Sequence, residues 1–164
     1  MEGAKHDIQV RMAVPEDCSQ VASVLAESFV EYESFYTPEA YTATTPTLDK
    51  IQTRLNEGPT WIALRNGAVV GTVSAVPEGE VLYVRSMAVL PAARGLGIGE
   101  ILLNHIESYA SAHGYKRLTL STTPFFSHAI HLYENFGFRR SNEGPQDLFG
   151  TPLFMMSKNL RQQD

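Results

Sequence analysis

The sequence predicts an α/β (α+β) fold in a single domain over residues 1–164, with a mixed, mostly antiparallel central sheet flanked by about four helices. Asn66-Gly67 separates two apolar runs, which is the strongest short signal of a β-hairpin. A glycine-rich corner at residues 94–99 leads from an apolar run, residues 81–90, into a helix-patterned segment, residues 98–112. The next apolar run must lie parallel to residues 81–90 because a helical crossover joins them. The sheet is therefore expected to contain one central parallel β–loop–α–β crossover.

The first third of the chain predicts a strand and two helices around a less regular segment. Residues 8–14 alternate apolar and polar side chains, as in a half-buried strand. Pro15, followed by two acids, begins a helix that continues to Phe29, and residues 48–55 predict a further short helix. Residues 30–46 mix aromatic and acidic side chains. They leave two compatible interpretations open, an irregular helix–loop whose aromatic rings pack on the core and a wall on the substrate side.

The rest of the chain alternates strands and helices. Residues 61–64, 68–76 and 81–90 predict a three-stranded antiparallel meander whose last strand leads into the glycine corner. The helix over residues 98–112 carries an apolar stripe, and Gly114 is its C-cap candidate. The remaining predicted elements are a parallel strand at 118–120, a helix at 129–136 that Gly137 ends, and extended segments at 138–140 and 152–157.

Composition narrows the class of protein. With 164 residues, a net charge of −5 and 43% hydrophobic content, the chain is expected to be a globular protein that does not bind nucleic acid non-specifically. Residues 1–13 lack the apolar core of a signal peptide, and no apolar run approaches the roughly 18 residues of a membrane span, so a cytoplasmic location without a membrane partner is expected. The lone Cys18 excludes an internal disulfide framework, and no His, Cys and Asp cluster has metal-ligand spacing.

Three phosphate-binding motifs compete for the corner Arg94-Gly95-Leu96-Gly97-Ile98-Gly99. Uncovered backbone N–H groups at the start of a helix favour an anion there. A P-loop requires Lys and then Ser or Thr after its last glycine, whereas Glu100 and Ile101 follow Gly99. A dinucleotide fingerprint requires G-x-G-x-x-G, whereas the sixth place counted from Gly95 is Glu100. What remains is the pattern Arg-x-x-Gly-x-Gly after an apolar strand.

This corner and a second motif resemble the GNAT superfamily of acyl-CoA-dependent N-acyltransferases. In that family an apolar strand and a Val-x-Pro exit lead through Arg/Gln-x-x-Gly-x-Gly/Ala into an amphipathic helix, and here Val89-Leu90-Pro91 precedes the corner. The family then has Ala-x-x-Leu-Tyr-x-x-x-Gly-Phe, and this chain has Ala129-Ile130-His131-Leu132-Tyr133-Glu134-Asn135-Phe136-Gly137-Phe138. The two motifs lie in the family's order and at its usual separation, so the resemblance covers nearly the whole chain.

The resemblance implies acetyl-CoA as cosubstrate. Its pyrophosphate would be held by backbone N–H groups across Arg94, Gly95, Leu96, Gly97, Ile98, Gly99 and Glu100. The Arg94 side chain would either contact that ligand or brace the fold. Main-chain groups of Met87, Ala88 and Val89 would bind the pantetheine arm where this strand splays from its parallel neighbour. Phe126 stands where the family often has an Asn that contacts the arm, so an apolar contact is expected there.

Catalytic roles follow from the same resemblance. Tyr133 matches the family tyrosine that protonates the departing thiolate, with a purely structural core aromatic as the alternative. The amine must lose a proton, and Glu80, at the entrance to the central strand, is a candidate base, although a solvated turn acid is the more common interpretation of that position. Glu31, Glu33 and His128 are weaker candidates. Ser121 stands where members that acetylate protein N-termini often carry a base, which argues against that substrate.

Together these expectations describe an N-acetyltransferase that moves the acetyl group of acetyl-CoA to a primary amine by direct attack. No acyl-enzyme is expected, since no Cys or Ser sits in a nucleophile setting. Residues 30–41 and 142–150 favour a closed pocket for a small-molecule amine. Protein lysine or N-terminal acetylation stays open as an alternative, and so does a non-catalytic module that senses acyl-CoA. A homodimer is also left open.

Overall fold

The computed structural model describes residues 7–160, so the first half of the segment inspected for a signal peptide lies outside the described residues. Its main sheet has seven strands in the order β1-β2-β3-β4-β5-β9-β6, and β7 and β8 form a separate hairpin. The strands are β1 (Ile8–Met12), β2 (Thr60–Arg65), β3 (Ala68–Glu78), β4 (Val81–Val89), β5 (Arg117–Thr122), β6 (Arg139–Ser141), β7 (Asp147–Leu148), β8 (Thr151–Pro152) and β9 (Phe154–Asn159). The α-helices are α2 (Cys18–Phe29), α3 (Pro38–Thr44), α4 (Leu48–Arg54), α5 (Ile98–Ala112) and α6 (Ser127–Phe136).

The first half of the sheet is the antiparallel meander that the sequence predicts. β1 pairs with β2, β2 with β3 and β3 with β4, all antiparallel. Asn66 and Gly67 both have positive φ, at 52° and 81°, which is the backbone of a two-residue type I′ hairpin. The predicted hairpin between β2 and β3 is therefore confirmed together with its turn chemistry.

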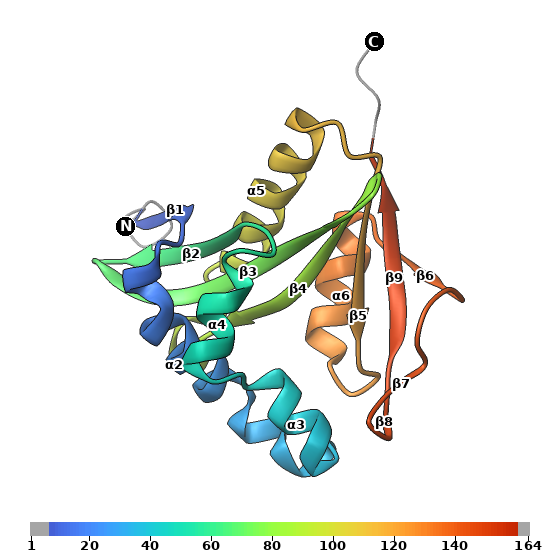
Figure 1. Cartoon of the computed structure of the whole chain (residues 1–164), viewed down its shortest axis with the longest axis horizontal. Helices are drawn as coiled ribbons and strands as arrows, with labels where there is room; N and C mark the ends of the chain where they lie inside the picture. Colours follow the sequence, from blue (N-terminus) through green and yellow to red (C-terminus); the bar gives the residue numbers. More distant parts are fainter. Residues whose placement is uncertain (1–6, 161–164) are drawn as a thin grey trace.

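The parallel crossover is also confirmed, and it lies at the centre of the sheet. β4 and β5 are parallel neighbours joined through α5. The sequence does not indicate the order of the last strands. β9 lies between β5 and β6, so the strand nearest the C-terminus of the described chain is inserted beside the parallel pair and leaves β6 at the edge (Figure 1).

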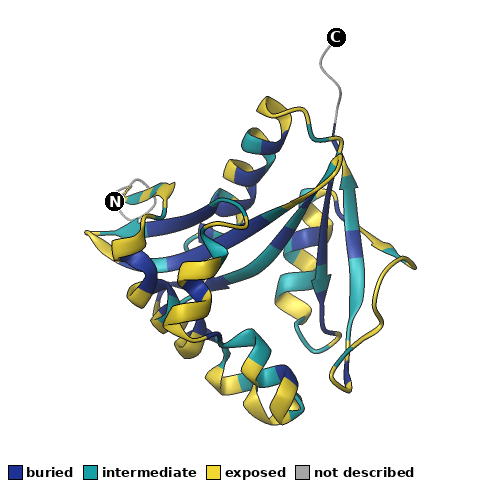
Figure 2. Cartoon of the chain, viewed as in Figure 1, coloured by how far each residue is buried: buried dark blue, intermediate teal, exposed yellow. Residues whose placement is uncertain are grey.

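Helices cover both faces of the sheet because side chains alternate along each strand. On β2, Trp61 and Ala63 join the cluster of buried residues that includes α5 and Tyr133 of α6, whereas Ile62 joins the cluster that includes α2 and Ile51 of α4. Figure 2 shows the central strands buried between helices whose outer surfaces are exposed. The core thus consists of two apolar layers with the sheet between them.

The central parallel pair separates along its length. β4 pairs with β5 only from Val81 to Val84, four residue pairs in all, and beyond Val84 the two strands diverge (Figure 1). At the point of divergence β4 carries a bulge, since two of its residues, Ser86 and Met87, face one residue of β3. Ser86 has a φ of 58°, a left-handed conformation that is uncommon outside glycine. The bulge therefore marks the end of parallel pairing.

Two segments differ from what the sequence predicts. Residues 30–46 form a 3₁₀ helix, η2 (Val30–Phe35), and then α3, which begins with Pro38 in its first turn and is capped by the hydroxyl of Thr37. The predicted final strand at 152–157 is divided, because Pro152 pairs with Asp147 in the β7–β8 hairpin and β9 begins only at Phe154. None of the described helices is long and apolar enough to cross a bilayer.

Candidate active site

A cavity of about 880 Å³ opens where β4 and β5 diverge. Residues 83–89 of β4 and 120–122 of β5 line it, and so do the corner before α5 and one side of α6. Its remaining lining comes from the stretch between the end of α2 and the end of α4, from the loop before α6 and from the β7–β8 region. Segments that are distant in sequence therefore meet around one space.

The glycine corner borders this cavity, and its glycines serve different purposes. Gly95 and Gly97 have positive φ, at 86° and 77°, where other residues are strained. Gly99 has a packing role, since a Cβ there would lie 2.8 Å from Cδ2 of Leu132 on α6. Gly97 is the N-cap of α5 and offers no side-chain cap, so the first N–H groups of the helix keep their hydrogen-bonding capacity for an anion.

Most of the residues predicted to bind the cosubstrate line the cavity. Those that do are Met87, Ala88, Val89, Arg94, Gly95, Gly97, Ile98, Gly99, Glu100 and Phe126. Leu96 does not, because its side chain packs against the buried cluster under α5. The sequence assigns only the backbone N–H of Leu96 to the pyrophosphate, and the packing of the side chain leaves that prediction open.

Arg94 joins the corner to the opposite wall. Its guanidinium forms an ion pair with Glu31 of η2, and Nη2 donates to the backbone oxygen of Ser28 at 3.3 Å. Arg94 and Glu31 are both about half exposed, so the pair is a weak one. Arg94 thus braces the fold, and because it also borders the cavity, its contact with the cosubstrate stays a prediction.

Tyr133 lies on α6 with its ring packed edge-on against Phe138, at 5.9 Å between centroids. The residue is 8% exposed and borders the cavity. Burial, with a smaller effect of Tyr83, raises the pKa of Tyr133 well above the usual tyrosine value. The hydroxyl therefore stays protonated through the physiological range, which is the state that a proton donor requires.

Phe126 belongs to a group of aromatic rings that forms one wall of the cavity. It lies edge-on to Tyr32, at 4.7 Å between centroids, and 4.8 Å from Phe125. Tyr36 lies edge-on to Phe125 at 5.1 Å. The rings at 32 and 36 come from η2 and the turn after it, so the segment 30–46 both packs as an aromatic cluster and lines the cavity. The rings pack against one another and against the loop before α6 rather than on the two buried clusters, and the interpretation as a substrate-side wall stays a prediction.

The two segments expected on the substrate side are joined directly. The Thr37 hydroxyl donates to the backbone oxygen of Phe149 at 2.7 Å, and the Thr37 N–H donates to Oγ1 of Thr151 at 2.9 Å. We call these two bonds the Thr37 clasp. It fastens the start of α3 to the β7–β8 hairpin, from which Asp147 and Leu148 line the cavity.

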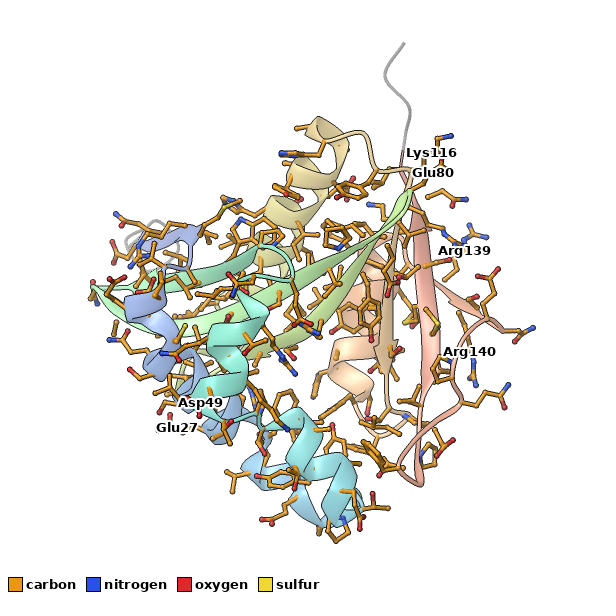
Figure 3. The ribbon with its side chains drawn as sticks, in the orientation of Figure 1. Glu27, Asp49, Glu80, Lys116, Arg139 and Arg140 are labelled. Atoms are coloured by element: carbon orange, nitrogen blue, oxygen red, sulfur yellow. The ribbon has the colours of Figure 1, made fainter. Side chains whose placement is uncertain are left out.

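Glu80 lies at the entrance to β4, the central strand, as the sequence predicts, but it does not line the cavity, which argues against the proposed role as base. It precedes β4 at the end of the strand where β4 and β5 are paired, whereas the cavity begins near Tyr83 and follows the diverging end. Its side chain is 71% exposed and forms an ion pair with Lys116 at 3.1 Å; Figure 3 shows the two side by side. The structure supports the solvated turn acid, and we do not assign Glu80 as the base.

Sequence reasoning missed two charged side chains that line the cavity. Arg54, at the last turn of α4, and Arg85, on β4, both line the cavity, as do Tyr36 and Tyr83. An arginine at a helix C-terminus has an ordinary role with the helix dipole, so the local pattern carried no signal for Arg54. Among residues 7–160 no group of three or more His, Cys, Asp and Glu side chains is arranged to hold a metal ion.

Comparisons with known proteins agree with this arrangement. A family model described as "Acetyltransferase (GNAT) family" matches residues 23–138. YjgM, an uncharacterized N-acetyltransferase of Escherichia coli (strain K12), is 32% identical over 135 residues, which cover 79% of this chain and 80% of that protein. The N-acetylaspartate synthetase of Danio rerio is 35% identical over 85 residues, which cover 51% of this chain but only 30% of that protein.

A solved structure shares the fold. The PaiA N-acetyltransferase from Thermoplasma acidophilum, crystallised in complex with coenzyme A, has a TM-score of 0.81 and 18% identity, with 93% of this chain and 98% of that chain covered. The match to the family model spans more than half of the chain, and YjgM is matched over most of both chains. By these matches, the chain belongs to the GNAT family of acetyltransferases, whose members use acetyl-CoA.

Proposed function

We propose that the protein transfers the acetyl group of acetyl-CoA to the primary amine of a small molecule, by direct attack and without an acyl-enzyme. One observation carries this proposal: a single cavity is bordered by the glycine corner, by Tyr133 and by the aromatic wall. A cosubstrate held at the corner and an acceptor held at the wall would share that cavity. Their reacting groups would then meet near the divergence of β4 and β5.

The corner supplies the anchor for acetyl-CoA. The uncapped N-terminus of α5 offers backbone N–H groups and the positive end of the helix dipole to the pyrophosphate. Beyond Val84, β4 has no strand partner on the side of β5 among residues 7–160, so its main-chain groups there are available to a pantetheine arm. Bound acetyl-CoA supplies a thioester, at which a C–N bond forms to the amine while the C–S bond breaks.

Tyr133 is the proton donor in this proposal. Its raised pKa keeps the hydroxyl protonated, and the hydroxyl would give its proton to the thiolate as the C–S bond breaks. The amine must lose a proton as well, and His128 and Asp147 are cavity-lining groups that could accept it. Cys18 is buried in the cluster under α2, away from the cavity, which fits a route without an acyl-enzyme.

A small acceptor is supported by the closure of the amine side. The aromatic wall and the β7–β8 hairpin are fastened together by the Thr37 clasp, which leaves less room for an extended peptide than an open groove would. The name of one relative, N-acetylaspartate synthetase, points to a small-molecule product as well. The protein-acetylating alternative stays as an outcome of the test.

The test incubates the protein with acetyl-CoA and each of a panel of amines, and it measures the release of the coenzyme A thiol. We expect turnover with at least one small primary amine and little or none with lysine-containing peptides or peptides with free N-termini. Preferential turnover of the peptides would support the protein-acetylating alternative. Tight binding of acetyl-CoA by calorimetry, without thiol release from any amine, would contradict the proposal and identify a sensor.

A further inference from the structure

We propose that the acceptor amine also carries a carboxylate, which Arg54 binds at the amine side of the cavity. The inference rests on the proposed function and narrows its substrate class to amino-acid-type amines. Arg54 lies in the last turn of α4, is partly buried and borders the cavity. Its position brings a positive charge to the cavity lining, beside that of Arg85.

Contacts within the protein fix Arg54 without neutralising it. Nη1 donates to Oγ of Ser86 at 2.9 Å. Ser86 is the residue with left-handed backbone in the bulge of β4, so the guanidinium is tied to the strand along which the cosubstrate would lie. None of the ion pairs formed by residues 7–160 includes Arg54. Since an arginine has five N–H donors, several remain for a ligand.

The charged groups around Arg54 also leave its positive charge without a negative partner. Glu57 is close, but its carboxylate pairs with Arg85 at 2.9 Å. Burial is the main cause that lowers the pKa of Arg54, and the charge of Arg85 lowers it further. Nε of Arg85 is buried and has no hydrogen-bond partner within the described part of the chain. Two arginines therefore share one exposed acid, and a single negative charge in the cavity would compensate the second.

A carboxylate would match the unpaired guanidinium of Arg54 in both charge and shape. It carries one negative charge, and its two oxygens match the planar fork of a guanidinium. The same positive charge repels an ammonium group, so the amine of a bound amino acid would be directed away from Arg54. That repulsion also favours the neutral, nucleophilic amine. Tyr32 and Tyr36 would cover the body of such a substrate.

The experiment compares L-phenylalanine with phenethylamine, which lacks only the carboxylate, as acceptors for acetyl-CoA. The wild-type protein should prefer L-phenylalanine by about 10- to 100-fold in kcat/KM, the range expected for a charge-assisted pair. In Arg54→Gln the preference should fall to about threefold or less, while Arg54→Lys should restore part of it. Lys50→Gln removes a positive charge from an exposed position on the same helix, outside the cavity lining, and should keep the preference.

A second measurement separates this proposal from the proposed function. N-acetyl-L-phenylalanine, added with coenzyme A, should raise the melting temperature of the wild-type protein and of Lys50→Gln but not that of Arg54→Gln. If no amine is acetylated, the proposed function fails, and this shift still decides whether Arg54 binds a carboxylate. The carboxylate proposal is overturned by an unchanged preference in Arg54→Gln, by equal losses for both amines, or by the absence of any shift in the wild-type protein. Circular dichroism of each variant verifies folding.

Discussion

Tyr133 combines the two properties that a proton donor needs, a position at the cavity and a hydroxyl that resists ionisation. Burial in the cluster under α5 raises its pKa, and the same burial fixes the ring against Phe138. The structural and catalytic interpretations of this residue are therefore compatible, because the packing that makes it a core aromatic also keeps its hydroxyl protonated.

Replacing Tyr133 by Phe should lower kcat by roughly 100-fold, the lower part of the range for general acid catalysis. The ring and its packing are retained, so the Kd for acetyl-CoA should stay within about twofold, as measured by calorimetry. Tyr115→Phe is the matched control, since that ring packs on the same cluster without lining the cavity. Unchanged turnover in Tyr133→Phe would remove the hydroxyl from the mechanism.

Residues differ in how well the sequence predicts their place. Tyr133 and the glycines at 95, 97 and 99 belong to local motifs, and all of them border the cavity. Arg54 and Glu80 have no such motif. Their neighbours come from residues about 30 positions away, Ser86 for Arg54 and Lys116 for Glu80, and only the folded chain sets those contacts. The sequence therefore predicts a place at the cavity for residues in local motifs, and it does not do so for side chains whose place depends on a distant partner.

At the scale of elements, the part of the cavity that the proposed function assigns to the amine, called the amine side, depends on the contact between α3 and the β7–β8 hairpin. Both elements are short, at seven residues for α3 and two for each strand, and neither would be stable alone. The Thr37 clasp gives each of them a partner. The geometry of the amine side is therefore sensitive to a few hydrogen bonds, whereas the corner before α5 is supported by a long helix in the core.

Replacing Thr37 by Val removes the hydroxyl that bonds to Phe149 and caps α3. We expect KM for the amine to rise by about three- to tenfold, the cost of one hydrogen bond of about 1 kcal/mol, while the Kd for acetyl-CoA stays unchanged. Steady-state kinetics with each substrate varied in turn gives both values. Thr42→Val is the control, because its hydroxyl bonds only to Pro38 within α3. Equal effects of the two substitutions on KM would show that the clasp does not shape the amine side.

For the whole molecule, the order of elements is easier to predict than their final neighbours. The meander, the parallel crossover and both layers of helices follow from periodicity, turn residues and the handedness of crossovers. The insertion of β9 between β5 and β6 does not, because any of the last strands could have paired with β5 on the basis of its own residues. Strand order there is decided by packing across the whole sheet.

The stability of the whole molecule should fall at alkaline pH. Burial is the main cause that raises the pKa of both Tyr36 and Tyr133, and the hydroxyl of Thr123 acts in the opposite direction on Tyr36. In the unfolded chain both tyrosines ionise near pH 10, so the unfolded state releases protons that the folded state keeps. The contribution of the two protonated hydroxyls to the free energy of unfolding is fully present below pH 10 and is lost as the pH rises. At about pH 10.5 the loss should be about 0.8 kcal/mol for each tyrosine.

Urea unfolding followed by circular dichroism at pH 8 and at pH 10.5 measures this loss. The double variant Tyr36→Phe/Tyr133→Phe should lose less free energy of unfolding between these two values than the wild-type protein does, by about 1.7 kcal/mol for the pair. Loss of lysine ion pairs affects both proteins alike and cancels in the difference. An equal loss of free energy of unfolding in the two proteins would show that folding does not raise the pKa of either hydroxyl.

The ion pair between Arg94 and Glu31 has a consequence for how the two substrates influence each other. The carboxylate of Glu31 pairs with Arg94 beside the corner, where the proposed function places the anionic pyrophosphate. In the proposed function, an arriving pyrophosphate would compete with this exposed pair, which is worth less than about 1 kcal/mol, so the exchange would cost little. Glu31 precedes Tyr32 of the aromatic wall in η2, so release of Glu31 from Arg94 would change the contacts of this wall. In the proposed function, binding of the coenzyme would therefore affect the amine side, because Arg94 would exchange Glu31 for the pyrophosphate.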